Sequence, residues 1–137
     1  MVVLSVSIPL ITLAEIEYGM EAKNWGATSR DLMRRFLTRF TLLLPDTETA
    51  HVWARIKRGC ETQGRPITFA DAWIAAAALQ LNVPLVTHNA RDYRAVDKLT
   101  ILTASSASST RKRGYSGNMK HALSLLIMHH LLIHFPF

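Results

Sequence analysis

The sequence predicts a domain of the α/β class, in which helices cover both faces of a parallel sheet. Short, wholly apolar segments alternate along the chain with longer segments of helical periodicity. Apolar strands of this kind are typical of parallel sheets that are buried on both faces. The composition agrees with a folded domain, because 49% of the 137 residues are hydrophobic and only 19% are charged. This length suffices for one domain.

The first part of the chain predicts two strands and two helices. Residues 2–10 are rich in β-forming side chains and predict a strand, after which Thr12 begins a helix. A second helix follows Thr28 or Ser29, and its apolar residues share one stripe at helical spacing: Leu32, Met33, Phe36, Leu37 and Phe40. Residues 41–45 are apolar and end at a proline, so they predict a buried strand.

The next part predicts two more helices and two more strands. Residues 47–64 form a helix that ends at a glycine, with an inner face of Val52, Trp53, Ile56 and Cys60. Thr68 opens an alanine-rich helix, which Asn82 ends. Residues 83–87 and 99–102 predict short strands, and the segment NARDYRAV between them predicts a turn and a short helix.

The net charge of +6 is concentrated in one region of the chain. Residues 1–97 hold 11 Lys and Arg against 10 Asp and Glu, whereas residues 98–137 hold five Lys and Arg and no acid. We therefore expect a nearly neutral domain over residues 1–103 and a divergent basic and apolar tail over residues 104–137. The basic surplus of the tail is no evidence that the domain itself binds nucleic acid.

Cysteine content and apolar segments limit the class of protein further. The single cysteine, Cys60, excludes an internal disulfide, so a cytoplasmic location is expected. No basic residue precedes the apolar opening, which argues against a signal peptide. The apolar stretch at residues 121–137 contains four histidines and is too short for a stable membrane span, although attachment to a membrane surface stays open.

Three acidic residues share a local pattern, in which a capping residue is followed three positions later by a carboxylate. The pairs are Thr12–Glu15, Thr68–Asp71 and Asn89–Asp92. One interpretation is the capping box, in which each acid binds backbone N–H groups of its own helix. The other is a shared site, because helices that follow parallel strands begin at the edge of the sheet where ligands bind. Carboxylates gathered there would bind a hard divalent cation able to activate water.

The segments SIPLITLAEIEYGM, GRPITFADAWIAAAALQLNVPLVTHNARDY and KLTIL resemble the PIN-domain ribonucleases, specifically the VapC-type toxins of toxin–antitoxin pairs. The resemblance covers about residues 5–103. Its most specific part is the DAWIAAAAL segment followed by LVTHN and RDY. It implies a PIN-like three-layer fold and an endoribonuclease that depends on Mg²⁺ or Mn²⁺. It also implies RNA as substrate, a homodimer and a cognate antitoxin.

The same resemblance assigns roles to individual residues. Glu15 matches the acid that follows the family's TLA element, and Asp71 matches the acid that opens the alanine-rich helix. Asp92 matches the acid of the closing element, with Thr87 and Asn89 as polar residues that line the pocket. The implied catalytic and metal-binding set is Glu15, Asp71 and Asp92, and whether Asn89 or Asp92 contacts the metal stays open.

The chain departs from the family pattern at its start. Family members begin with a strand that ends in an Asp-Thr-Asn type motif, whereas Ser5 and Ser7 stand in the first apolar segment here. We therefore expect the first central strand and its Asp to be missing, which would weaken cation binding and leave backbone groups of the sheet unpaired. This departure keeps a second hypothesis open, a catalytically inactive module that binds an antitoxin or self-associates. A third is a peripheral membrane protein held by its apolar tail.

Overall fold

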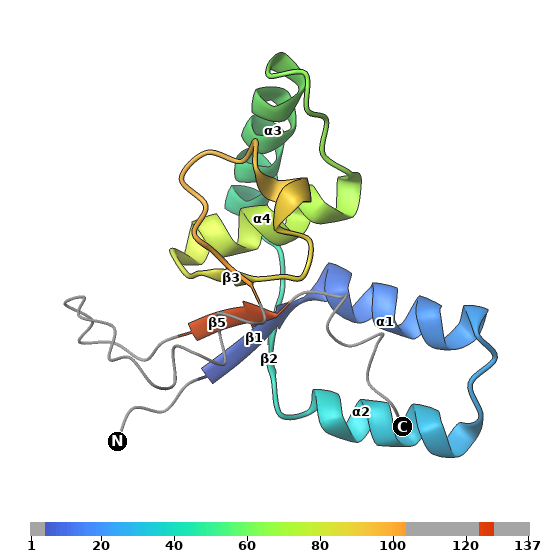
Figure 1. Ribbon diagram of the computed structural model, residues 1–137. Coiled ribbons are helices and arrows are strands. Elements are labelled where there is room, and N and C mark those ends of the chain that lie inside the picture. Colours follow the sequence, from blue (N-terminus) through green and yellow to red (C-terminus); the bar gives the residue numbers. More distant parts are fainter. Residues whose placement is uncertain (1–4, 104–123, 128–137) are drawn as a thin grey trace.

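The computed structural model describes residues 5–103 and 124–127 (Figure 1). Four α-helices, a short 3₁₀ helix and the strands of one sheet make up this part of the chain. They are β1 (Ser5–Pro9), α1 (Leu10–Ala22), α2 (Ala27–Leu37), β2 (Thr41–Leu43), α3 (Thr47–Thr62), α4 (Phe69–Leu81), β3 (Leu85–Val86), η1 (Ala90–Tyr93), β4 (Ile101–Leu102) and β5 (Ser124–Ile127).

All strands run parallel in one sheet with the order β2-β1-β5-β3-β4. The register pairs Ser7 with both Thr41 and Leu126, and Leu85 with both Leu126 and Ile101. Figure 1 shows α3 and α4 on one side of the strands, with α1 and α2 extending from another. The predicted α/β class with a parallel sheet between helices is therefore confirmed.

The middle of the sheet is occupied by β5, a strand that the sequence analysis missed. It pairs with β1 on one side and with β3 on the other. Its residues, 124–127, come from the segment that we expected to lie outside the domain. Because β5 lies between them, β1 and β3 each have a hydrogen-bonded neighbour there, whereas a missing central strand was expected to leave backbone groups of the sheet unpaired.

Two groups of buried side chains hold the helices to the sheet. The larger lies around α3 and α4 and includes Ile56, Cys60, Ile74, Leu85 and Tyr93. Its centre is the row of α4 alanines, which are small enough for neighbouring elements to approach the helix backbone: Ala72, Ala75, Ala76, Ala77 and Ala78. The smaller group joins β1, α1 and α2 through Ile8, Ile16, Met20, Met33 and Leu37.

The local capping signals of α4 are confirmed. The Thr68 hydroxyl accepts a hydrogen bond from the Asp71 backbone N–H at 3.1 Å. Asn82 ends the helix in the left-handed conformation, with φ of 52°. Gly64 also has a positive φ, 66°, just after α3 ends. The predicted ends of α3 at Gly64 and of α4 at Asn82 therefore lie within two residues of the observed ends.

Two sequence expectations are wrong. Residues 41–45 do not form a buried strand, because β2 lies at the edge of the sheet and both Thr41 and Leu42 are exposed. Thr12 does not begin α1, because the helix already starts at Leu10. Within residues 5–103 and 124–127, no helix is long and apolar enough to cross a membrane.

Candidate functional site

The three predicted acids come from three different elements. Glu15 lies in the second turn of α1 and is half-buried. Asp71 lies in the first turn of α4 and is also half-buried, whereas Asp92 in η1 is exposed. The elements α1 and η1 follow β1 and β3, so both begin at the same edge of the parallel sheet. The expected placement of Glu15 and Asp92 at that edge agrees with the topology.

These acids share an environment through Tyr93, the last residue of η1. The Tyr93 ring is completely buried, and its hydroxyl donates a hydrogen bond to Asp71 Oδ1 at 3.0 Å. Burial raises the pKa of the Tyr93 hydroxyl well above its usual range, and the charge of Asp71 together with its hydrogen bond raises it further. The charges of Asp92 and Glu15 act in the same direction. All three carboxylates therefore influence one buried hydroxyl.

The capping-box interpretation does not account for Glu15. Pro9 occupies the N-cap position of α1, where no side chain caps the helix. Thr12 lies inside the helix and is fully buried. In the described part of the chain, its Oγ1 atom has no hydrogen-bond partner. The proposed box between Thr12 and Glu15 is therefore wrong.

The two other capping pairs differ from each other. Thr68 does cap α4, while the Asp71 carboxylate accepts its hydrogen bond from Tyr93, a residue 22 positions further along the chain. Asn89 occupies the N-cap position of η1 but makes no side-chain capping bond. The carboxylate of Asp71 thus makes a long-range contact that a cap does not require.

The polar residues Thr87 and Asn89 shape the turn that leads to Asp92. Thr87 is fully buried, and its Oγ1 accepts a hydrogen bond from the Asn89 backbone N–H at 2.9 Å. The Asn89 carbonyl then accepts from the Asp92 backbone N–H at 3.0 Å. These bonds fix the path of the backbone between β3 and η1, so Thr87 contributes to the site by placing Asp92.

The chemistry of these side chains suits a hard divalent cation, which prefers carboxylate and other oxygen ligands. Their spacing fits such a cation less well. Among the residues that the structure describes, no group of three or more His, Cys, Asp or Glu side chains is close enough together to hold a metal ion. In the described structure the three acids are therefore not a preformed set of three ligands, although all three raise the pKa of the Tyr93 hydroxyl.

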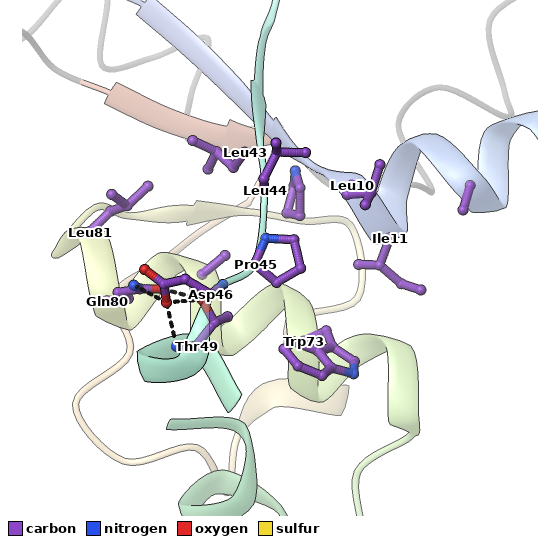
Figure 2. A pocket seen from close by; sticks show the side chains of 13 residues that line it. Leu10, Ile11, Leu43, Leu44, Pro45, Asp46, Thr49, Trp73, Gln80 and Leu81 are labelled. Atoms are coloured by element: carbon purple, nitrogen blue, oxygen red, sulfur yellow. Dashed lines mark hydrogen bonds between the residues drawn. The ribbon is translucent and has the colours of Figure 1, made fainter. Parts of the chain in front are cut away.

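An apolar groove of about 380 Å³ is lined by residues of α1, β2, α3 and α4 (Figure 2). Its lining includes Ala14 and Trp73, which are close in sequence to Glu15 and Asp71, but it does not include those acids or Asp92. At one end, Asp46, Thr49 and Gln80 form a hydrogen-bonded cluster. Hydrogen bonds from Thr49 and then Gln80 lower the pKa of Asp46 below its usual value.

Three aromatic rings hold the start of α4 against α3. Trp53 and Trp73 stack with ring centroids 5.7 Å apart, and Phe69 meets both edge-on. Trp53 Nε1 also donates a hydrogen bond to the Phe69 carbonyl at 3.2 Å. Because Phe69 and Trp73 flank Asp71 in α4, this packing fixes the turn that carries Asp71. Phe69 remains 61% exposed.

The contact between Tyr93 and Asp71 was not predicted from the sequence. The residue appeared only as the last letter of the RDY segment, and nothing local indicates that its hydroxyl contacts an acid in another helix. One signal was available: Tyr93 stands beside Asp92 in a predicted short helix. A buried tyrosine hydroxyl normally needs a hydrogen-bond partner, which could have pointed to a nearby acid.

Comparisons with known proteins agree with the fold. A family model described as PIN domain matches residues 4–99. Ribonuclease VapC1 of Haemophilus influenzae (strain R2866) is 30% identical over 89 residues, which are 65% of this chain and 66% of that protein. Ribonuclease VapC5 of Mycobacterium tuberculosis (strain ATCC 25618 / H37Rv) is 32% identical over 97 residues, 67% of this chain and 69% of that protein.

A solved structure is similar as well. The structure of VapBC-1 from nontypeable Haemophilus influenzae matches with a TM-score of 0.64 and 27% identity, covering 72% of this chain and 74% of that one. The chain thus spans about two thirds of the length of the Haemophilus VapC1 relative.

Proposed function

The chain belongs to the PIN-domain family, and from this premise we propose that it is a VapC-type endoribonuclease, the toxin of a toxin–antitoxin pair. The observation that carries the proposal is the hydrogen bond between Asp71 and the buried Tyr93 hydroxyl, whose pKa the charges of Asp92 and Glu15 also raise. These three acids, which are far apart in the sequence, thus place negative charge around one buried side chain and create one anionic region. Such a region is what phosphodiester hydrolysis with a divalent cation requires.

In this proposal, Glu15, Asp71 and Asp92 hold Mg²⁺ or Mn²⁺. The bound cation would supply charge neutralisation at the phosphodiester and activation of water. Asp71 is held in place by Tyr93 and by the first turn of α4, while Thr87 and Asn89 set the position of Asp92. Exposed Arg91 and Arg94 lie next to Asp92 and Tyr93 in sequence and would contact RNA phosphates.

The proposed partners are RNA as substrate, a cognate antitoxin and a second copy of the chain, all in the cytoplasm. The similarity to VapBC-1 supports the antitoxin. Support for a homodimer comes from large apolar side chains that remain exposed near the groove, since exposed apolar patches commonly mark interfaces. These are Leu10, Leu44, Phe69 and Leu81, which are 40–69% exposed.

A second candidate function is a catalytically inactive module that binds an antitoxin or self-associates. One observation favours it: no three acidic, histidine or cysteine side chains in the described residues are close enough to hold a metal ion. A module of this kind would keep the fold and the exposed apolar surface without cleaving RNA.

The test is RNA cleavage by the purified full chain. Labelled RNA should be cut when Mg²⁺ or Mn²⁺ is present and should remain intact in EDTA. Asp71→Asn keeps the size of the side chain but removes its charge. It should slow cleavage by at least about 100-fold, because even the loss of a residue that only hydrogen-bonds a metal ligand costs about 10–100-fold in metal sites. Asp97→Asn is the matched control, because Asp97 is exposed and is not one of the three predicted acids.

Each outcome separates the two candidates. Cleavage by the wild type and by Asp97→Asn, with loss in Asp71→Asn, supports the nuclease. Equal cleavage by Asp71→Asn contradicts it. No cleavage by any variant, together with a dimer in light scattering, supports the inactive module.

A further inference from the structure

The environment of Tyr93 is unusual for a core aromatic residue. Its side chain is fully buried in the apolar cluster around α4, yet its hydroxyl faces a carboxylate at 3.0 Å. A buried hydroxyl needs a partner, and a neutral partner such as a backbone carbonyl would satisfy it at lower electrostatic cost. In the structure, this hydroxyl instead donates its hydrogen bond to the Asp71 carboxylate.

The hydrogen bond has a fixed direction. An ionised carboxylate can only accept, so the tyrosine must donate. Asp71 Oδ1 therefore accepts from a buried donor, while Oδ2 accepts no hydrogen bond within the described residues.

Tyr93 is also held firmly. It ends η1, its carbonyl accepts a hydrogen bond from the Val96 backbone N–H at 3.0 Å, and its ring lies in the same core cluster as the α4 alanines. Asp71 is fixed on the other side, because its backbone N–H is bound by Thr68 Oγ1. A rigid donor thus meets a carboxylate on a rigid helix.

From this geometry we propose that Tyr93 is a positioning residue, which orients the Asp71 carboxylate so that its second oxygen is available to a divalent cation. The inference rests on the proposed function, since it assumes that Asp71 binds metal. Donors of this kind fix the orientation of ligands in metal sites, and their removal typically weakens binding by about 10–100-fold.

The experiment measures Mn²⁺ binding to the full chain by titration calorimetry without RNA, and RNA cleavage in parallel. Tyr93→Phe removes only the hydroxyl and should weaken Mn²⁺ binding by about 10-fold or more. Tyr18→Phe is the matched control, because Tyr18 is 73% exposed, and it should bind Mn²⁺ as the wild type does. In an Asp71→Asn background, Tyr93→Phe should cause no further loss.

The results separate this inference from the proposed function. Mn²⁺ binding by the wild type that is unchanged in Tyr93→Phe overturns the role of Tyr93 and leaves the nuclease proposal standing. Wild-type protein that neither binds Mn²⁺ nor cleaves RNA overturns both.

A second measurement applies if Tyr93→Phe does not fold. The hydroxyl proton of a buried, hydrogen-bonded tyrosine exchanges slowly and can be followed by NMR in the wild-type protein. Addition of Mg²⁺ should shift this resonance, because the cation would bind the same carboxylate. An unchanged Tyr93 hydroxyl resonance, while amides around Asp92 shift, overturns the inference.

Discussion

Thr12 and Thr49 show how the same residue type has opposite energetic roles in this protein. Both are buried, with exposures of 0% and 3%. Thr49 Oγ1 makes hydrogen bonds with Asp46 and Gln80, whereas Thr12 Oγ1 has no partner within the described residues. A buried hydroxyl without a partner costs about 1–3 kcal/mol relative to one that is satisfied.

We therefore expect Thr12→Val to raise the free energy of unfolding by up to about 1 kcal/mol, because valine has the same shape without the polar atom. Thr49→Val should lower it by about 1–3 kcal/mol, because it removes a hydroxyl that is hydrogen-bonded. Urea denaturation of both variants measures the difference. A loss of stability in Thr12→Val would show that its hydroxyl is bound after all.

Cys60 illustrates a prediction at the same scale that the structure confirms. The helical pattern predicted a core residue, and Cys60 is 1% exposed on the inner face of α3. Burial raises the pKa of its thiol, which reduces the reactive thiolate at neutral pH. The residue therefore serves packing rather than nucleophilic chemistry.

At the scale of elements, α4 depends on the small size of its alanines. Ala72, Ala75, Ala76 and Ala78 have no exposed surface, so the neighbouring elements are in close contact with the helix. In an interior packed this tightly, removing atoms leaves a cavity, whereas added atoms must displace their neighbours.

Ala76→Leu should lower the free energy of unfolding by about 1–3 kcal/mol, because the larger side chain has no space. Ala54→Leu in α3 is the matched control, since Ala54 is exposed, and it should change stability by less than about 0.5 kcal/mol. Thermal unfolding followed by circular dichroism compares them. Equal stability of the two variants would contradict the tight packing of α4.

The elements that could be predicted from sequence are those with local signals. Thr68 and Asn82 mark the ends of α4 through their own backbone and side-chain preferences, and both were predicted. The exposure of β2 and the existence of β5 depend on which strands become neighbours, and pairing between distant segments leaves little trace in either segment. The bond between Tyr93 and Asp71 was missed for the same reason, because the two residues meet only in the folded chain.

At the scale of the whole molecule, the sheet depends on β5. This strand supplies the partners of both β1 and β3, so its removal would expose two inner edges of the sheet. Unpaired edges lose hydrogen bonds and provide a template for pairing with other chains.

Deletion of residues 104–137 should therefore lower the thermal midpoint and promote aggregation. In the full chain, Leu126→Pro should act in the same direction, because proline removes a backbone donor from a strand that has neighbours on both sides. Leu126→Val keeps the donor and is the control. Thermal scans with light scattering test this, and a truncated chain that unfolds at the wild-type temperature would exclude a structural role for β5.

The position of β5 also has a consequence for biosynthesis. During translation, β1, β2, β3 and β4 all leave the ribosome before the strand that separates β1 from β3 in the finished sheet. A nascent chain therefore cannot complete its hydrogen-bond ladders while it is being made, and we expect assembly to wait for residue 127. An RNA-cutting activity that relies on this sheet would emerge only after synthesis has passed that point.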